Sequence, residues 1–296
     1  MKTLLTGCLG QVGCEIERQC SSYGFEIKST HKNNLDIAQP DQVRKIIEEE
    51  NIDIVINAAA YTAVDNAEND EEKAHEVNAI GSEVLARVTA DHNIPLLHIS
   101  TDYVFDGNST FPYTELMETN PQGAYGRTKL AGERLVSSIN PKHLILRTSW
   151  VFGSTGSNFV KTMLRIGSER EEVSVVSDQL GSPTFAGHIA SALLQVSQQY
   201  SEEKPVRWGT YHFTDAGITT WHMFATKIMQ LGFDAGLLAT LPKVLPILSE
   251  NYPTPAKRPH YSGLDCSRFI SSFPQISIQP WEKGLLEVIS SLKNNV

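Results

Sequence analysis

The chain of 296 residues is 41% hydrophobic and 20% charged, so it can bury a substantial core in one large domain or two smaller ones. Its formal net charge of -9 argues against a general nucleic-acid binder, which normally carries a basic surplus. No window resembles a signal peptide or a membrane span, so we expect a soluble, cytoplasmic protein with neither a nucleic acid nor a membrane as partner.

Short apolar runs alternate with amphipathic stretches through the first half of the chain. The runs rich in Ile, Leu and Val, which we expect to be strands, are residues 2–6, 25–29, 52–60, 94–100 and 143–149. The helices expected between them are residues 10–22, 39–50, 69–93 and 124–139. Strict alternation of strand and helix predicts an α/β fold with a Rossmann-type, doubly wound parallel sheet.

Three glycines stand where the first strand gives way to the first helix. Gly7 would end the strand in a tight turn, Gly10 would let backbone N–H groups approach a pyrophosphate, and Gly13 would allow close helix packing. A glycine-rich turn without a ligand is the simpler alternative, but the position at the start of an alternating α/β chain favours a dinucleotide site. The GxxGxxG spacing is typical of the extended short-chain dehydrogenases/reductases.

The loop after the second strand bears on the choice of cofactor. It has the sequence THKNN, with no acidic residue at its tip to hold a free ribose 2'-hydroxyl. Ser29, Thr30, His31 and Lys32 could instead accept a 2'-phosphate. We therefore expect NADPH to be preferred; if these are ordinary loop residues, NADH serves as well.

The helix expected at residues 124–139 carries Tyr125 and Lys129, four positions apart and therefore on one face. A phenol with a pKa of about 10 is a poor acid near neutrality, and a neighbouring ammonium lowers that pKa. The pair could protonate a carbonyl oxygen while hydride moves to its carbon. Ser100 and Thr101, at the end of the fourth strand, could supply hydroxyls to the same carbonyl. A surface tyrosine beside a solvated lysine is the alternative for an isolated YxxxK.

The alternation of strand and helix loosens after Trp150. Strand-like runs follow at residues 173–177 and 209–215, and residues 241–259 are rich in proline. We expect an NAD(P)-binding Rossmann domain over residues 1–149. Residues 150–296 would form a smaller substrate-binding lobe, interleaved with late elements of the first domain.

Successive motifs along almost the whole chain resemble those of the dTDP-4-dehydrorhamnose reductase family of extended short-chain reductases. They are NAAAYTAVDNAE, STDYVFDG, YGRTKLAGE, LRTSWVFG, DQLGSPT and YPTPAKRP. The resemblance implies that NADPH or NADH reduces the C4 ketone of a dTDP-linked 4-keto-6-deoxyhexose. It also implies that Tyr125 protonates the new alkoxide, that Lys129 binds the nicotinamide ribose and tunes Tyr125, and that Thr101 polarises the ketone.

The same resemblance supplies the remaining candidate residues. Those implied at the cofactor are Gly7, Gly10, Gln11, Val12, Gly13, Asp36, Ile37, Ala58, Ala59, Ala60, Thr62, Tyr125 and Lys129. Those implied at the sugar nucleotide are Thr101, Asp102, Tyr103, Trp150 and Arg258, the last as a clamp on the diphosphate. The simpler alternatives are a packed strand end for the alanines, a turn for Asp36, a helix cap for Asp65, core packing for Tyr103 and Trp150, and a solvated Arg258.

Related activities can be weighed on the same residues. A 4,6-dehydratase usually carries Asp-Glu after the threonine, and here Tyr103 follows Asp102, which disfavours dehydration. A 4-epimerase would keep Tyr125 and Lys129 and stays open. A non-catalytic, NADP-binding regulatory subunit, like that of methionine adenosyltransferase, is the other alternative, and the intact Thr101, Tyr125 and Lys129 favour an enzyme over it.

Neither the cysteines nor the acidic residues form a pattern typical of a metal site. Cys8, Cys14, Cys20 and Cys266 lack CxxC spacing and a nearby histidine set, so we expect free thiols. Some members of the family resembled are dimers with Mg²⁺ between acidic side chains, and Glu15 matches one of these. Gly187 and His188 stand where a second carboxylate would be needed. We expect no metal, Glu15 as a favourable charge in the first turn of its helix, and a monomer or homodimer.

Overall fold

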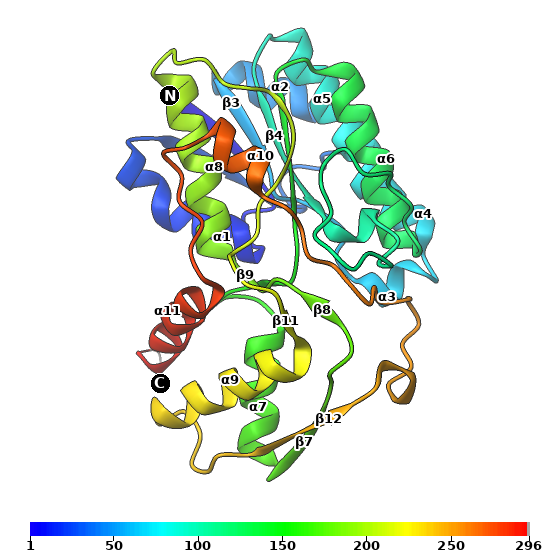
Figure 1. Ribbon diagram of the computed structural model, residues 1–296. Helices are drawn as coiled ribbons and strands as arrows, with labels where there is room; N and C mark the ends of the chain where they lie inside the picture. Colours follow the sequence, from blue (N-terminus) through cyan, green and yellow to red (C-terminus); the bar gives the residue numbers. More distant parts are fainter. Residues whose placement is uncertain (295–296) are drawn as a thin grey trace.

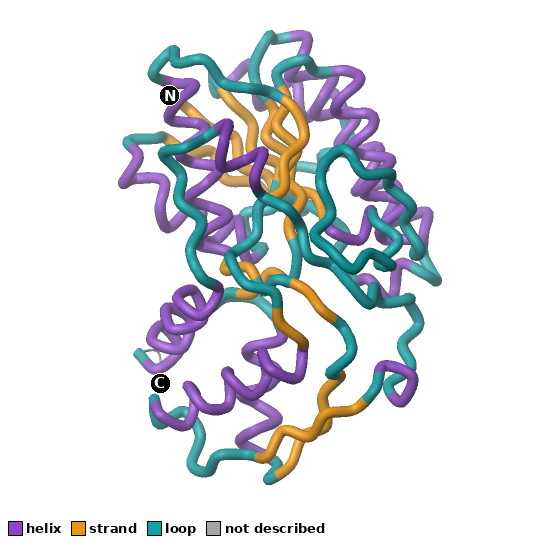
Figure 2. The backbone as a smooth tube through the Cα atoms, viewed as in Figure 1, coloured by secondary structure: helices purple, strands orange, loops and turns teal. Residues whose placement is uncertain are grey.

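The computed structural model describes residues 1–294. Figure 1 shows two unequal parts, a larger one built on a sheet flanked by helices and a smaller one, drawn below it, built from short helices and strand ribbons. The chain passes between the two parts more than once, because a strand formed after residue 150 joins the sheet of the larger part. The same strands stand out as one bundle in Figure 2.

Six parallel strands form the central sheet, in the order β10-β5-β4-β3-β1-β2. Their bounds are β1 Lys2–Thr6, β2 Glu26–Thr30, β3 Ile54–Asn57, β4 Leu96–Thr101, β5 His143–Thr148 and β10 Gly209–His212. The first five lie where the sequence predicts strands, and the doubly wound α/β class is confirmed. Because β1 pairs with β2 on one side and β3 on the other, the crossovers diverge there and leave a crevice at the carboxyl ends of the strands.

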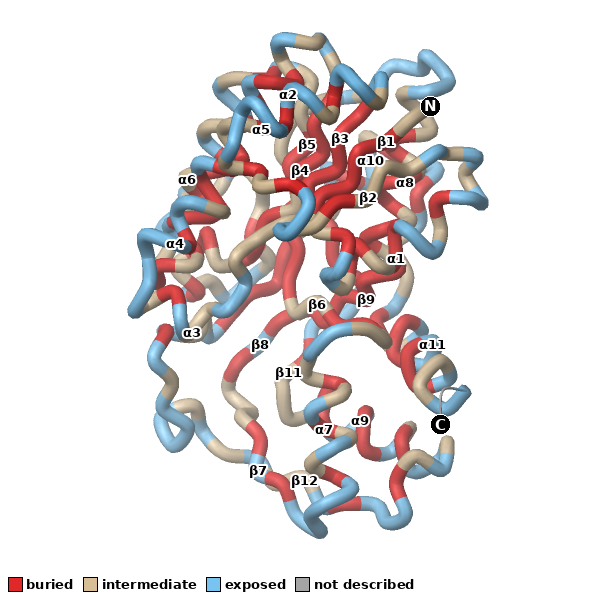
Figure 3. The backbone as a smooth tube through the Cα atoms, turned by 180° about the vertical axis from the view of Figure 1, so that it is seen from behind, coloured by how far each residue is buried: buried red, intermediate tan, exposed pale blue. Residues whose placement is uncertain are grey.

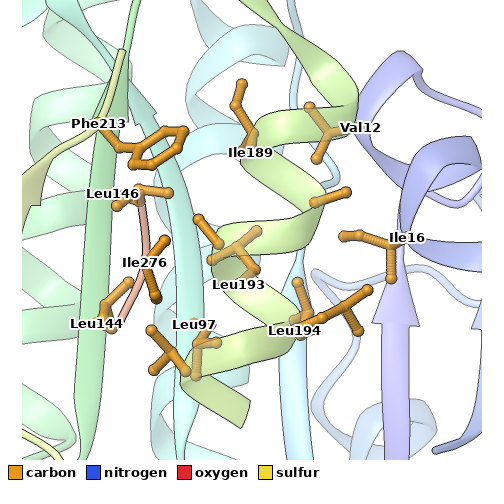
Figure 4. Packing of buried hydrophobic residues seen from close by; sticks show 14 of the residues in the cluster. Val12, Ile16, Leu97, Leu144, Leu146, Ile189, Leu193, Leu194, Phe213 and Ile276 are labelled. Atoms are coloured by element: carbon orange, nitrogen blue, oxygen red, sulfur yellow. The ribbon is translucent and has the colours of Figure 1, made fainter. Parts of the chain in front are cut away.

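Apolar side chains on alternate strand positions point to opposite faces of the sheet, and each face has its own helices. One face is covered by α1 Gln11–Gln19, α8 Ala186–Ser201 and α10 Ser267–Ser272, and the other by α2 Pro40–Glu49, α5 Gly81–Asp91 and α6 Ala124–Ile139. Figure 4 shows Ile189, Leu193 and Leu194 of α8 packed between Val12 and Ile16 of α1 and the leucines of the sheet. Strands β1, β3, β4 and β5 are accordingly almost continuously buried, whereas the edge strand β2 is not (Figure 3).

The single helix expected at residues 69–93 is divided. After the short helix α3 Val64–Ala67, the chain forms α4 Glu71–His75, a π-helical turn η2 Glu76–Ile80 and then α5. Asn78 lies within the π turn, and its side chain accepts from the backbone N–H of Tyr61 at 2.9 Å and donates to the Thr128 hydroxyl at 3.1 Å. The π turn thus places the Asn78 amide between the loop after β3 and helix α6. The pattern of apolar residues in the sequence does not predict this turn.

The smaller part has a core of its own, made by helices packed on a two-stranded ribbon. Its elements are α7 Phe159–Glu169, β7 Glu172–Val176, α9 Trp221–Asp234, β12 Lys243–Ile247 and α11 Trp281–Lys293. Four two-residue strands form two further ribbons, in which β6 Val151–Phe152 pairs with β9 Thr184–Phe185 and β8 Leu180–Gly181 pairs with β11 Thr219–Thr220. Short 3-10 turns complete the chain, namely η1 Cys20–Tyr23, η3 Asp102–Val104 and η4 Ser249–Asn251. No helix within residues 1–294 has both the length and the apolar character to span a bilayer.

Candidate active site

A cavity of about 820 Å³ lies over the carboxyl ends of the sheet strands. The predicted cofactor residues that line it are Gly7, Gly10, Gln11, Val12, Asp36, Ile37, Ala58, Ala59, Ala60, Thr62, Tyr125 and Lys129. The predicted substrate residues that line it are Thr101, Asp102, Tyr103 and Trp150. Among the residues predicted at the cofactor and the sugar nucleotide, Gly13, Ser29 and Arg258 are not lining residues.

The glycine turn packs so closely on neighbouring backbone that a Cβ at Gly7 or Gly13 would collide with it. Gly7 has a φ of +72°, and a Cβ there would lie 2.5 Å from the backbone nitrogen of Ala59. Gly13 packs directly on the carbonyl of Gly7 and the backbone of Cys8, which is why it stands behind the cavity wall. Gly10 precedes the first residue of α1, so the free N–H groups of that helix face the cavity. An anionic diphosphate fits this backbone cradle.

The far end of the cavity is formed by the loop after β2. Thr30, His31 and Lys32 line it, whereas Ser29 lies within β2 and does not. The carboxylate of Asp36 also reaches this end, and its Oδ1 accepts the backbone N–H of Ala38 at 3.0 Å. Asp36 therefore combines both roles considered for it: it lines the cavity, and its side chain stabilises a turn.

The hydroxyl and amine groups expected for proton transfer come from β4 and α6. Thr101 ends β4, and Tyr125 and Lys129 lie on the first two turns of α6. Glu68, which sequence reasoning missed, accepts the N–H of Ala124 at 2.8 Å and so satisfies the free N-terminus of this helix. Gly123, which precedes the first residue of α6, has no side chain that could cap the helix, so the acceptor for the Ala124 N–H comes from a distant loop.

The pKa shift of Tyr125 differs from the one expected from the sequence, and the pKa of Lys129 is shifted as well. Burial raises the pKa of the Tyr125 phenol, and the adjacent Thr101 hydroxyl offsets only part of this rise. Burial lowers the pKa of Lys129 to about 8, and its Nζ donates to the carbonyl of Ile99 at 2.7 Å. The lowered pKa expected for Tyr125 is therefore not found: burial of the phenol is the largest cause of its shift, and Lys129 is not among the groups that shift it.

Asp102 carries a buried carboxyl group that faces the cavity. Its Oδ1 accepts the Thr101 hydroxyl at 3.0 Å, while its buried Oδ2 has no hydrogen-bond partner among the described residues. Burial raises the pKa of this group to about 7. A carboxyl that is half protonated near neutrality can both donate to and accept from a ligand hydroxyl.

Tyr103 and Arg258 are joined on the wall next to Asp102. Arg258 donates to the Tyr103 hydroxyl at 3.0 Å and to the carboxylate of Asp65 at 2.6 Å. Asp65 is not the cap of its helix, since Ala63 holds that position and Asp65 accepts the backbone N–H of Ala256 instead. The arginine is thus held by a carboxylate from the first half of the chain rather than solvated.

Trp150 forms the lobe side of the cavity. Its backbone has a φ of +46°, a strained value for a bulky residue. Its ring stacks on Trp221 with centroids 3.5 Å apart and planes 8° from parallel. Trp221, at the start of α9, was not predicted, and only the aromatic density of the segment WHMF signals it.

Glu15 does not play the role predicted for it. It lies in the second turn of α1 rather than the first, and its carboxylate accepts both Nε and Nη2 of Arg18, at 2.9 and 2.6 Å. The predicted stabilisation of the helix N-terminus is therefore wrong, and the side chain pairs with a cation. His188 Nδ1 lies 2.8 Å from Asp215. Within residues 1–294, no three or more His, Cys, Asp or Glu side chains gather as a metal ligand set.

The glycine turn, the crevice of a doubly wound sheet and the threonine, tyrosine and lysine beside it define the class of this protein as an extended short-chain dehydrogenase/reductase. Comparison with known proteins narrows this class. The family described as "RmlD substrate binding domain" matches residues 1–294. The chain belongs to the dTDP-4-dehydrorhamnose reductase family, as its motifs suggested.

Two curated relatives and two solved structures carry this assignment. The dTDP-4-dehydrorhamnose reductase of Aggregatibacter actinomycetemcomitans is 40% identical over 97% of this chain and 98% of its own. That of Escherichia coli K12 is 38% identical over 99% and 98%. The Clostridium acetobutylicum structure has a TM-score of 0.91 at 41% identity, covering 99% of this chain and 100% of its own. That of Bacillus anthracis, in complex with NADP, has a TM-score of 0.89 at 34% identity, covering 98% and 99%.

Proposed function

We propose that this chain is an oxidoreductase that reduces the C4 ketone of dTDP-4-dehydro-L-rhamnose to dTDP-L-rhamnose with NADPH. The single observation that carries this is the convergence of Thr101, Tyr125 and Lys129 on one cavity that the glycine turn also lines. The names of its relatives supply the substrate, and the Bacillus anthracis complex with NADP supports the cofactor.

The cavity can hold the cofactor along the ends of the strands. The helix N–H groups at Gly10 and Gln11 would bind the diphosphate, and Thr30, His31 and Lys32 would face a 2'-phosphate. The remaining wall residues proposed along the cofactor are Gly7, Val12, Asp36, Ile37, Ala58, Ala59, Ala60 and Thr62, with Gly13 packed behind them. When bound, NADPH supplies the hydride for C4.

Tyr125 supplies the proton that completes the reduction. As hydride adds to C4 the carbonyl oxygen becomes an alkoxide, and the phenol proton passes to that oxygen. The raised pKa of Tyr125 keeps the phenol protonated until the alkoxide forms. Thr101 would donate a hydrogen bond to the same oxygen and so polarise the ketone. Lys129 would hold the ribose of the nicotinamide.

The sugar nucleotide would lie between the end of β4 and the lobe. Asp102 and Tyr103 would meet the sugar from one side, and Trp150 from the other. Arg258 would turn from Asp65 toward the diphosphate, where its fork of donors matches phosphate oxygens. We also propose residues 1–149 as the cofactor domain and 150–296 as the substrate lobe, with β10 and α8 returned to the first. A cytoplasmic location and a monomer or homodimer complete the proposal.

The experiment that tests this function is NADPH oxidation, followed by the loss of its absorbance, with dTDP-4-dehydro-L-rhamnose as substrate. We expect stoichiometric oxidation and the appearance of dTDP-L-rhamnose. A 4-epimerase would convert the sugar without net oxidation of NADPH, and a regulatory subunit would bind NADPH without turnover. Either result would overturn the proposal. The Thermus thermophilus UDP-glucose 4-epimerase shares the fold at 17% identity, so a direct measurement is the right discriminator.

A further inference from the structure

A buried row of polar side chains runs under the cavity to the amine of Lys129. Thr6 of β1 donates its hydroxyl to Asn57 Oδ1 at 2.7 Å. Asn57 Nδ2, at the end of β3, lies 3.0 Å from His98 Nδ1, on β4. His98 Nε2 lies 3.4 Å from Lys129 Nζ, on α6. Thr6, Asn57 and His98 are all at most 1% exposed, so no water on the surface can exchange for these partners.

The backbone determines the direction of every hydrogen bond in this row. The N–H of Ala59 lies 3.1 Å from the same Asn57 atom that receives Thr6, and a backbone N–H can only donate. That atom must therefore be the amide oxygen, so the amide nitrogen faces His98. An amide nitrogen donates and does not accept, which makes His98 Nδ1 the acceptor. A neutral imidazole with an accepting Nδ1 carries its proton on Nε2, the nitrogen that faces Lys129.

We propose that Asn57 fixes His98 in the tautomer that is protonated on Nε2, and that His98 thereby acts as a positioning residue that favours the uncharged amine of Lys129. An ammonium at Lys129 would bring its positive charge and its N–H groups within 3.4 Å of another N–H. The free amine has a lone pair for the His98 N–H and still donates to the carbonyl of Ile99. Only the assignment of Lys129 to the reaction rests on the proposed function; the tautomer itself does not.

The other titratable groups around the row shift the pKa values of His98 and Lys129. His143, on β5, is the other ionisable group that lowers the pKa of His98, whose burial is the main cause. Glu133, one turn after Lys129 on α6, raises the pKa of that lysine, but its carboxylate is already paired with Arg147 at 2.7 Å. Tyr125, on the same face of α6, is uncharged near neutrality. Burial is the largest cause that lowers the pKa of Lys129, and among the described contacts His98 is the side chain within hydrogen-bond distance of its Nζ.

Nuclear magnetic resonance of the full chain labelled with ¹⁵N-histidine tests the tautomer directly. The long-range ¹H–¹⁵N correlations of a ring show which nitrogen carries the proton, and His98→Gln identifies the signals of His98 by their loss. We expect the Nε2–H form. A wild-type spectrum with the proton on Nδ1, or with the two forms in exchange, would overturn the proposal, and this measurement needs no folded variant of Asn57.

Asn57→Asp then reverses the arrangement. The second carboxylate oxygen accepts from His98 Nδ1, so the proton moves to Nδ1 and Nε2 becomes an acceptor for the Lys129 ammonium. The pKa of Lys129, read from the pH dependence of trace acetylation of its peptide, should rise by about one unit. Thr6→Val is the matched control, because the Ala59 N–H still orients the Asn57 amide. This variant should change neither the tautomer of His98 nor the pKa of Lys129. An unchanged Lys129 in a folded Asn57→Asp variant would show that His98 does not govern its charge.

These readings are independent of turnover. If the chain fails to oxidise NADPH while His98 shows the Nε2–H form, the proposed function fails and the inference holds. If NADPH is oxidised with the sugar nucleotide while His98 carries its proton on Nδ1, the function holds and the inference fails.

Discussion

The sheet domain and the lobe build their walls of the cavity in different ways. The sheet wall is made of strand ends and the turns that follow them, so residues such as Gly7, Ala58 and Thr101 reach the cavity within a few positions of a strand. The lobe wall depends on a stack of two tryptophans 71 positions apart along the sequence, Trp150 and Trp221, and on strands of two residues. The first wall follows from local sequence, and the second from contacts between distant segments.

The largest effect should come from the chemistry on the sheet side. Tyr125→Phe removes the proposed proton donor, so we expect turnover to fall by about 10²- to 10⁴-fold while the Kd for NADPH changes little. Steady-state kinetics and an NADPH titration measure the two quantities. Tyr200→Phe, a half-buried tyrosine of α8 that does not line the cavity, is the control. Turnover within a few-fold of wild type in Tyr125→Phe would remove this residue from the proton step.

The lobe wall should respond in binding rather than in chemistry. Trp221→Ala takes away the ring that supports Trp150, so the KM for the sugar nucleotide should rise about tenfold while NADPH affinity is kept. Trp208→Ala is the control matched in size, because Trp208 makes an edge-to-face contact with Tyr200 and does not line the cavity. It should lower stability without changing that KM. Equal KM effects from both variants would contradict a specific role for the stack.

The sequence predicted the sheet wall better than the lobe wall and its distant contacts. The spacing of Tyr125 and Lys129 is local, and a helix of regular period places both on the cavity. The pairing of Asp65 with Arg258 spans 193 positions, so no periodicity could announce it, and the simple interpretation of Asp65 as a cap failed. Burial is equally invisible in a single sequence, and it reversed the expected pKa shift of Tyr125. Local geometry was predictable, whereas solvation and distant partners were not.

Asp102, which follows β4 on the sheet wall, should make stability depend on pH. Its folded pKa of about 7 lies above its usual value of 3.8, so the folded chain binds a proton that the unfolded chain releases. This contribution is present below the usual pKa and is lost as pH rises through the window from about 4 to 7. The loss amounts to about 1.4 kcal/mol per pH unit at most.

Denaturant unfolding across that window compares wild type with Asp102→Asn, which cannot ionise. We expect the variant to gain stability relative to wild type as the pH rises. Asp106→Asn is the control, because hydrogen bonding to Tyr113 lowers the pKa of Asp106 and its trend has the opposite sign. A constant difference between Asp102→Asn and wild type would mean that Asp102 is ionised throughout the window.

A smaller effect is expected at the adenine end of the sheet wall. Lys32→Ala removes one exposed cation from the proposed 2'-phosphate site, so kcat/KM for NADPH should fall about fivefold and that for NADH should stay constant. Lys45→Ala, on the exposed face of α2, is the matched control. Equal efficiency of wild type with NADH and NADPH would defeat the preference itself.

The smallest effect is expected from removal of metal ions. Proton transfer from Tyr125 and polarisation by Thr101 need no Lewis acid, so activity should be unchanged in excess EDTA. Glu15→Gln should cost at most about 1 kcal/mol, because its partner Arg18 is largely exposed and solvent screens the pair. Denaturant unfolding and the NADPH assay measure the two. Activity that is lost on chelation, returns with Mg²⁺ and disappears in Glu15→Gln would show that Glu15 contributes to a metal site, for which a second copy of the chain would have to bring further ligands.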